Sequence, residues 1–135
     1  MKCAKKTVLI IEDSQVQALA TKLLLESQGA NVFCAANGEA GVVMAFQTMP
    51  DVILLDIGLP GIDGLEVCRL LRTDARTVEI PVILCTVRIN IESRGKDLAG
   101  GIIDFIPKDA FFKTVLLATL RGMEIINAEH VPSFP

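Results

Sequence analysis

The sequence predicts a three-layer α/β domain in which a doubly wound, parallel five-stranded sheet is covered by helices on both faces. Strand-like and helix-like segments alternate along the 135 residues, which is the pattern of repeated strand–helix units. The strand-like segments are nearly all apolar, as in a sheet that is buried on both faces. Single helices between successive strands favour right-handed crossovers and therefore parallel strands. The chain length fits one domain with a substantial core.

The first strand and the first helix have clear signals at their ends. Residues 7–11 form a β-branched apolar run that indicates a strand. Ser14 then provides an N-cap, and Gly29 stands where a C′ glycine ends a helix. Between these two residues, apolar side chains recur at helical spacing, namely Val16, Leu19, Ala20, Leu23 and Leu24. This spacing predicts an amphipathic helix.

The later elements follow the same alternation. Short apolar runs mark the strands, and Pro50 and Pro81 interrupt the chain before two of them. In chain order we expect a strand at 31–36, a turn at Asn37 and Gly38, a helix at 39–48, a strand at 51–56, a helix at 64–72 with Leu65, Cys68 and Leu71 facing inward, a strand at 82–86, a helix at 91–99, a strand at 102–106 and a helix at 110–127.

Composition excludes several classes of protein. The chain is 51% hydrophobic and 21% charged, which argues against disorder. No apolar stretch approaches the roughly 20 residues of a membrane-spanning helix, and the apolar run near the N-terminus stops at Glu12, too early for a signal peptide. We therefore expect a cytoplasmic protein without a membrane partner. The net charge of −3 and the lack of a basic stripe also disfavour nucleic acid as a partner.

Polar side chains stand at the predicted carboxyl ends of the strands, where ligands bind in open parallel sheets. Glu12 and Asp13 follow the first strand, and Asp56 ends the third. Thr86 ends the fourth strand, and Lys108 follows the fifth. We expect these side chains to meet at one rim of the sheet, because topology brings the strand ends together.

This set of side chains indicates phosphoryl chemistry. Two carboxylates ~4 Å apart repel by about 4 kcal/mol at an effective dielectric of about 20, so three of them favour a bound cation. Oxygen ligands with open positions suit Mg²⁺. Lys108 and Thr86 could bind the oxygens of a phosphoryl group, with Asp56 as the nucleophile.

Four stretches together resemble the receiver domains of two-component response regulators, the CheY-like superfamily: "VLIIEDS", "PDVILLDIGLPGIDGLEVCRLLR", "IPVILCT" and "GIIDFIPK". The resemblance covers residues 7–127 and implies a flavodoxin-like (βα)₅ fold. It implies transfer of a phosphoryl group to Asp56 from a phosphohistidine of a sensor histidine kinase or of a histidine phosphotransfer protein. The chain would then be no enzyme in the usual sense, since it would catalyse only its own phosphotransfer and autodephosphorylation.

The resemblance also implies roles for particular residues, in the order of the chain. Glu12 would act on the metal through water, and Asp13 and Asp56 would be side-chain ligands of Mg²⁺ or Mn²⁺, with the backbone carbonyl of Gly58 as a further ligand. Lys108 and Thr86 would contact the phosphoryl group, and Thr86 and Phe105 would form the switch. Val87, Gly58 and Arg88 would tune access to the site and the lifetime of the phosphorylated state.

Domain organisation and output are predicted as follows. Residues 1–127 are the receiver domain, and residues 128–135 are a tail that is flexible or begins a linker. Output would use the face formed by the helix at 91–99, the strand at 102–106 and the helix at 110–127. On the last helix, Phe111, Val115 and Ile125 belong to a second apolar stripe that could contact an effector or a second copy of the chain.

Alternative functions stay open. A pseudo-receiver has the same fold but binds partners without phosphorylation; Val87 and Asp109 favour it slightly, since Asp109 follows Lys108 where the family usually has proline and could compete for the lysine. Mg²⁺ affinity would separate the two. A haloacid-dehalogenase-like phosphatase is disfavoured, because it needs a second aspartate where this chain has Gly58. A nucleotide-binding Rossmann domain is disfavoured because no glycine-rich loop follows the first strand.

Overall fold

The sheet is parallel and five-stranded, with the order β2-β1-β3-β4-β5. The computed structural model describes residues 5–56, 58, 64–86 and 102–126, and the statements below concern these residues. The strands are β1 (Thr7–Ile11), β2 (Asn31–Ala35), β3 (Val52–Asp56), β4 (Val82–Thr86) and β5 (Ile102–Pro107). The helices are α1 (Gln15–Ser27), α2 (Gly38–Thr48), α3 (Gly64–Arg72) and α5 (Phe112–Gly122).

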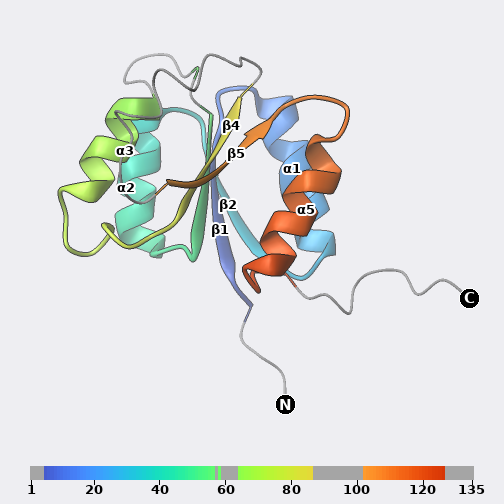
Figure 1. Cartoon of the computed structure of the whole chain (residues 1–135). Helices are drawn as coiled ribbons and strands as arrows, with labels where there is room; N and C mark the ends of the chain where they lie inside the picture. Colours follow the sequence, from blue (N-terminus) through green and yellow to red (C-terminus); the bar gives the residue numbers. More distant parts are fainter. Residues whose placement is uncertain (1–4, 57, 59–63, 87–101, 127–135) are drawn as a thin grey trace, which may run out of the picture.

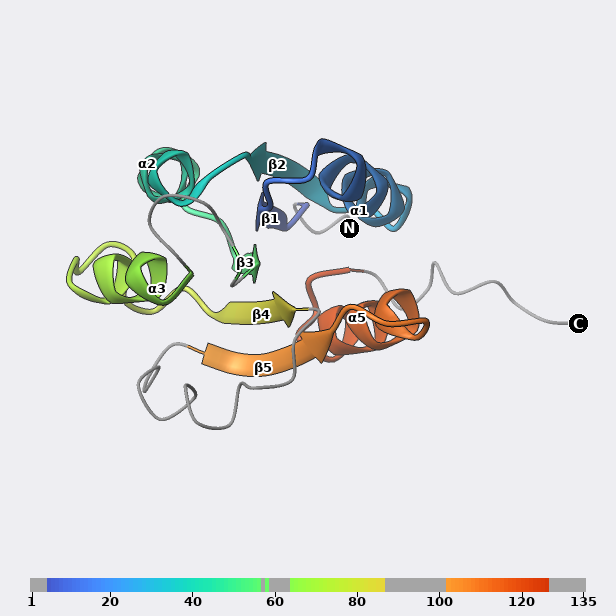
Figure 2. The ribbon, with the colours of Figure 1, turned by 90° about the horizontal axis from the view of Figure 1, so that it is seen from above.

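Helices cover both faces of the sheet, so the predicted three-layer fold is confirmed. Helices α1 and α5 lie on one face and α2 and α3 on the other, as both views show (Figures 1 and 2). Among the described helices, none has the length and apolar character needed to span a bilayer. The predicted helix at 91–99 and the tail at 128–135 lie outside the described residues.

The core consists of two apolar clusters, one on each face of the sheet. Successive residues of a strand point to opposite faces, so Val8 and Ile10 belong to one cluster while Leu9 and Ile11 belong to the other. The first cluster includes Leu25 of α1 and Leu116 and Leu120 of α5, and the second includes Ala45 of α2 and Val67 and Leu71 of α3. This burial on both faces explains why the strands are almost free of polar residues.

Helix α1 begins and ends where the sequence predicts, but its buried face differs from the predicted pattern. The side chain of Ser14 accepts a hydrogen bond from the backbone N–H of Gln17, and Gly29 follows the helix with a φ of 94°. The buried residues of the helix are Ala18 and Leu25. Three apolar side chains of the predicted pattern instead lie in solvent, with exposed fractions of 79% for Val16, 55% for Leu19 and 57% for Leu23.

The N-terminal boundaries of two further helices differ from prediction. Asn37 does not form a separate turn with Gly38; its Oδ1 accepts a hydrogen bond from the N–H of Ala40 at 2.8 Å and caps α2. Asp109 Oδ1 accepts from the N–H of Phe111 at 2.8 Å, and α5 starts at the next residue rather than at residue 110.

Helix α5 is also shorter than predicted at its C-terminal end, and this corrects one predicted contact residue. The helix ends at Gly122, and Glu124 adopts a left-handed φ of 63° that reverses the chain. Ile125 therefore packs into the core with only 7% of its surface exposed. The prediction that Ile125 lies on a contact surface is wrong, because the helical spacing on which it rested does not extend that far.

Candidate functional site

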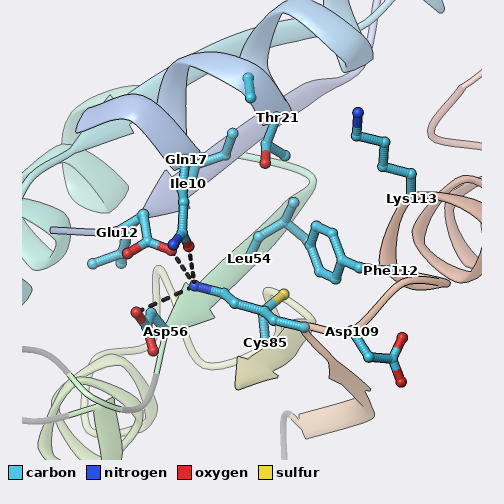
Figure 3. Close-up of a pocket in the computed structure, with 13 residues that line it drawn as sticks. Ile10, Glu12, Gln17, Thr21, Leu54, Asp56, Cys85, Asp109, Phe112 and Lys113 are labelled. Carbon is cyan, nitrogen blue, oxygen red and sulfur yellow. Dashed lines mark hydrogen bonds and ion pairs between the residues drawn. The ribbon is translucent and has the colours of Figure 1, made fainter. Parts of the chain in front are cut away.

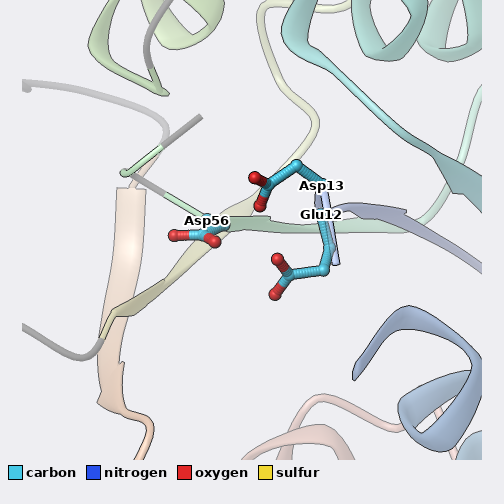
Figure 4. A group of neighbouring side chains, drawn as sticks. All are labelled: Glu12, Asp13 and Asp56. Carbon is cyan, nitrogen blue, oxygen red and sulfur yellow. The ribbon is translucent and has the colours of Figure 1, made fainter. Parts of the chain in front are cut away.

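Three carboxylates lie together at the carboxyl ends of β1 and β3. Glu12 and Asp13 follow β1, and Asp56 is the last residue of β3, which is the neighbour of β1 in the sheet. One carboxylate oxygen from each of the three lies within 4.8 Å of the others (Figure 4). Glu12 is buried, Asp56 is half-buried and Asp13 is exposed. The cluster therefore opens to solvent on the side of Asp13.

A lysine ammonium reaches the same cluster from β5. The register of β4 and β5 shifts between Val82 and Ile83, and Pro107 pairs with Thr86 at the end of the two strands. Lys108 leaves the sheet directly after that pair. Its Nζ forms an ion pair with Glu12 Oε1 and lies 3.3 Å from Asp56 Oδ2 (Figure 3). The structure thus brings Lys108, Glu12, Asp13 and Asp56 together.

Gln17 also belongs to this site, although the sequence analysis did not single it out. It lies in the first turn of α1, and its Oε1 accepts a hydrogen bond from Lys108 Nζ at 3.1 Å (Figure 3). Its position in the sequence could have indicated this role. Ser14 marks the start of a helix directly after the end of a strand, and the first turn of such a helix lies at the rim of the sheet.

Hydrogen bonds orient the two carboxylates that contact Lys108. Glu12 Oε2 accepts from the backbone N–H of Ser14 at 3.2 Å. Asp56 Oδ1 accepts from the backbone N–H of Gly58 at 3.0 Å, which leaves Oδ2 directed at the lysine. Each carboxylate is therefore held at one oxygen by a backbone amide and at the other by Lys108.

The side chains of the site described above carry more negative than positive charge. Burial raises the pKa of Glu12, although hydrogen bonds from Lys108 and Ser14 work in the opposite direction. Burial alone would lower the pKa of Lys108, but the hydrogen bond with Glu12 and the attraction of Asp56 outweigh it and raise that pKa. Lys108 is therefore charged at neutral pH. Among the described residues, the ammonium of Lys108 pairs with two of the three clustered carboxylates, so the cluster keeps an excess of negative charge that favours a further cation.

The donor set fits a hard divalent cation. The three carboxylates offer only oxygen atoms, which suits Mg²⁺ or Mn²⁺ better than a softer metal. The most exposed of them, Asp13, is not among the acceptors of Lys108 given above, so it can bind a cation without first breaking that ion pair.

A pocket of about 300 Å³ extends from the carboxylates into the space between α1 and α5 (Figure 3). Its apolar wall includes Leu54, Cys85 and Phe112, and Lys108 lines it along one side. Cys85 is buried in the core as predicted, and burial raises the pKa of its thiol to about 12. The pocket gives the lysine side chain space in which to move.

Other predicted site residues are placed as follows. Phe105 lies on β5 and is 36% exposed. The backbone of Thr86 ends β4, but its side chain, like Val87 and Arg88, lies outside the described residues. Asp109 is joined to Lys108 by a trans peptide bond, and its carboxylate accepts from Phe111 as described above. Asp109 is thus engaged in the turn that precedes α5.

Comparison with known proteins identifies a family. The model of the response regulator receiver domain matches residues 8–121. The regulatory protein AfsQ1 of Streptomyces coelicolor is 41% identical over 102 residues, which are 76% of this chain but 44% of AfsQ1. Protein PilH of Pseudomonas aeruginosa is 36% identical over 109 residues, 81% of this chain and 90% of PilH. The chain spans about half of RpaA of Synechocystis, 48% of its length.

Solved structures agree with these relatives. The chemotaxis protein CheY4 of Vibrio cholerae matches with a TM-score of 0.80 and 26% identity, covering 88% of this chain and 98% of CheY4. The receiver domain of the sensor histidine kinase PA1611 of Pseudomonas aeruginosa matches with a TM-score of 0.77 and 28% identity, covering 88% of this chain and 97% of that one. In that structure a magnesium ion is coordinated in the active site cleft.

Proposed function

This chain belongs to the response regulator receiver domain family of two-component signalling, and we propose that it acts as a switch that takes up a phosphoryl group on Asp56. The observation that carries the proposal is the position of Lys108 Nζ, 3.3 Å from Asp56 Oδ2 within a cluster of three carboxylates. An isolated strand-end aspartate would have no reason to share a half-buried ammonium with a second acid.

Asp56 is placed to act as a nucleophile. A carboxylate oxygen would attack phosphorus of a phosphohistidine, so that an O–P bond forms while the P–N bond breaks; the leaving imidazole nitrogen keeps the bonding electron pair and takes a proton from water. Hydrogen bonding from Gly58 fixes the orientation of the attacking group. The ammonium of Lys108 would offset the charge of the transferred oxygens, and the Thr86 hydroxyl is proposed as a second contact to them.

The proposed cation is Mg²⁺ or Mn²⁺. Asp13 and Asp56 would hold it through their side chains, Gly58 through its carbonyl and Glu12 through water. When bound, the cation would supply the positive charge that the carboxylates and the phosphoryl oxygens lack.

The exposed apolar side chains support a proposal for two contact surfaces. Val16, Leu19 and Leu23 lie on α1, whose first turn borders the site, and they would receive the sensor kinase or phosphotransfer protein that donates the phosphoryl group. Phe111, which directly precedes α5, and Val115 of α5 are 69% and 40% exposed and would contact an effector or a second copy.

We propose that phosphorylation changes the surface around Phe105 of β5, and that this change is the output signal. Thr86 moving toward the phosphoryl group would vacate space into which Phe105 could turn. We keep residues 1–127 as the proposed functional domain, residues 128–135 as a tail, and the cytoplasm as the proposed location, on the sequence grounds given above.

Intact mass spectrometry tests the proposal. With acetyl phosphate and Mg²⁺ the mass should rise by about 80 Da, the mass of one phosphoryl group. Asp56→Asn should abolish the increase, while Asp51→Asn, at the other end of β3, should leave it unchanged. Incorporation that persists in Asp56→Asn would show that another residue is the nucleophile.

The alternative is a pseudo-receiver, for which the sequence offers two arguments, Val87 and Asp109. The structure weakens the argument from Asp109. Asp109 could compete for Lys108 on sequence grounds, but its carboxylate accepts a hydrogen bond from the N–H of Phe111, and Lys108 contacts Glu12, Gln17 and Asp56. A pseudo-receiver would bind its partner equally well with or without acetyl phosphate, and it would have no need for Mg²⁺ affinity.

A further inference from the structure

The ammonium of Lys108 has as many acceptors as it has hydrogen atoms. Its three N–H groups face Glu12 after β1, Gln17 on α1 and Asp56 on β3 (Figure 3). If Lys108 is to contact a phosphoryl group, as the proposed function requires, at least one N–H group must leave its present acceptor. The contacts that stay then decide where the ammonium is held.

We propose that Gln17 is a positioning residue that keeps the Lys108 ammonium beside Asp56 while the contact with Glu12 is exchanged for a phosphoryl oxygen. This inference rests on the proposed function. It adds a role for Gln17, which lies in the first turn of α1.

Glu12 can give up the Lys108 ammonium and still keep other partners. Its Oε2 accepts from the N–H of Ser14, and it is one of the three oxygen donors of the proposed cation site. The amide of Gln17 is not a carboxylate and reaches Lys108 from α1. The Gln17 contact can therefore persist when the carboxylates rearrange.

The Gln17 amide is also suited to hold the lysine, because it is uncharged and its backbone is fixed in place. It is neutral, so it accepts a hydrogen bond without adding negative charge close to an incoming phosphoryl group. Its backbone N–H is fixed by Ser14 Oγ at 3.3 Å, which anchors the residue at the start of α1. A carboxylate at this position would hold the lysine more strongly but would repel the substrate.

The pocket between α1 and α5 explains why such an anchor is needed. Lys108 lines this space of about 300 Å³, whose wall is apolar at Leu54 and Phe112 and otherwise includes the hydroxyl of Thr21 and the cationic side chain of Lys113. The nearby carboxylate of Asp109 is engaged with the N–H of Phe111. Without Gln17, a lysine released by Glu12 would have one fewer contact at the site and free space around its side chain.

The variant Gln17→Met tests the proposal, because methionine keeps the side-chain length and removes the strong acceptor. The matched control is Gln15→Met, an exposed position in the same first turn. Initial rates of phosphoryl uptake from acetyl phosphate at saturating Mg²⁺ should fall about three- to tenfold in Gln17→Met, as expected for the loss of one ordinary, solvent-exposed hydrogen bond. Gln15→Met should match the wild type.

A second measurement follows Lys108 without phosphate or metal. ¹⁵N relaxation of the Lys108 Nζ should show a more mobile ammonium in Gln17→Met than in the wild type or in Gln15→Met. A rate that falls while Lys108 mobility is unchanged would overturn the inference, because the effect would not act through the lysine.

The outcomes separate this inference from the proposed function. Uptake in the wild type with an equal rate in Gln17→Met would overturn the role of Gln17 and leave Asp56 phosphorylation in place. No uptake in the wild type would overturn the proposed function and the role of Gln17 with it.

Discussion

The close approach of α2 to β1 at Gly41 leads to a quantitative prediction. A Cβ atom at this position would lie 2.5 Å from Ile11 Cδ1, 2.8 Å from Cγ1 and 3.1 Å from Cγ2. Ile11 is fully buried and is held in the sheet between β2 and β3, so it cannot move aside without disturbing the core. Gly41→Ala should therefore force α2 away from the sheet.

The size of the effect follows from two opposing contributions. Overpacking a filled core costs about 1–3 kcal/mol, whereas replacing glycine by alanine within a helix gains about 1 kcal/mol. We expect a net loss of up to about 2 kcal/mol in the free energy of unfolding. For a domain of this size the midpoint of thermal unfolding should fall by up to about 10 °C.

Urea unfolding followed by circular dichroism would measure this loss. The matched control is Gly122→Ala at the end of α5, where an added Cβ has no neighbour within 4 Å and stability should stay equal or rise by up to about 1 kcal/mol. Ile11→Val removes Cδ1, the atom nearest to the new methyl group, and should partly suppress Gly41→Ala.

The double variant provides the decisive comparison. Gly41→Ala with Ile11→Val should be more stable than the sum of the single effects by about 0.5–1.5 kcal/mol, since contacting residues couple. Unchanged stability in Gly41→Ala, together with additive effects in the double variant, would refute the reasoning that α2 packs directly on Ile11.

Three further predictions concern the site and its surroundings. Lys108→Met should slow phosphoryl uptake by about a hundredfold without weakening Mg²⁺ binding, since it removes a competing cation; a matching fall in calorimetric Mg²⁺ affinity would contradict this. Asp13→Asn should weaken Mg²⁺ binding by about tenfold or more in the same titration, and unchanged affinity would exclude Asp13 as a ligand. Cys85 should resist iodoacetamide at pH 8 in the folded protein and react in urea. Because its folded pKa is about 12 against an ordinary 9.0, its contribution to stability is complete below pH 9 and is lost as the pH rises toward 12, so stability that increases over this interval would be inconsistent with a buried neutral thiol.

The sequence predicted the sheet and the meeting of the acids because both follow from topology. Apolar runs fixed the strands, and parallel strands necessarily carry Glu12, Asp13 and Asp56 to one rim. Lys108 follows from the same rule, since it leaves β5 at that rim. None of these placements required knowledge of side-chain packing.

The differences from prediction arise where packing or capping decides. The apolar spacing of α1 indicated a helix but not which face is buried, and Val16 lies in solvent while the smaller Ala18 contacts the core. Ile125 was assigned to the surface because a helical period was extended through the turn at Glu124. Gln17 escaped notice because a hydrogen bond to a lysine 91 residues away leaves no local signal in the sequence.

The central claim, that Asp56 carries the phosphoryl group, is tested most directly by locating the modification. Sodium borohydride reduces an aspartyl phosphate to homoserine, which peptide mass spectrometry can assign to a single position. After treatment with acetyl phosphate and Mg²⁺, we predict homoserine at residue 56 and aspartate retained at Asp13 and Asp51. Homoserine elsewhere, or none in a sample whose intact mass shows phosphorylation, would contradict the account.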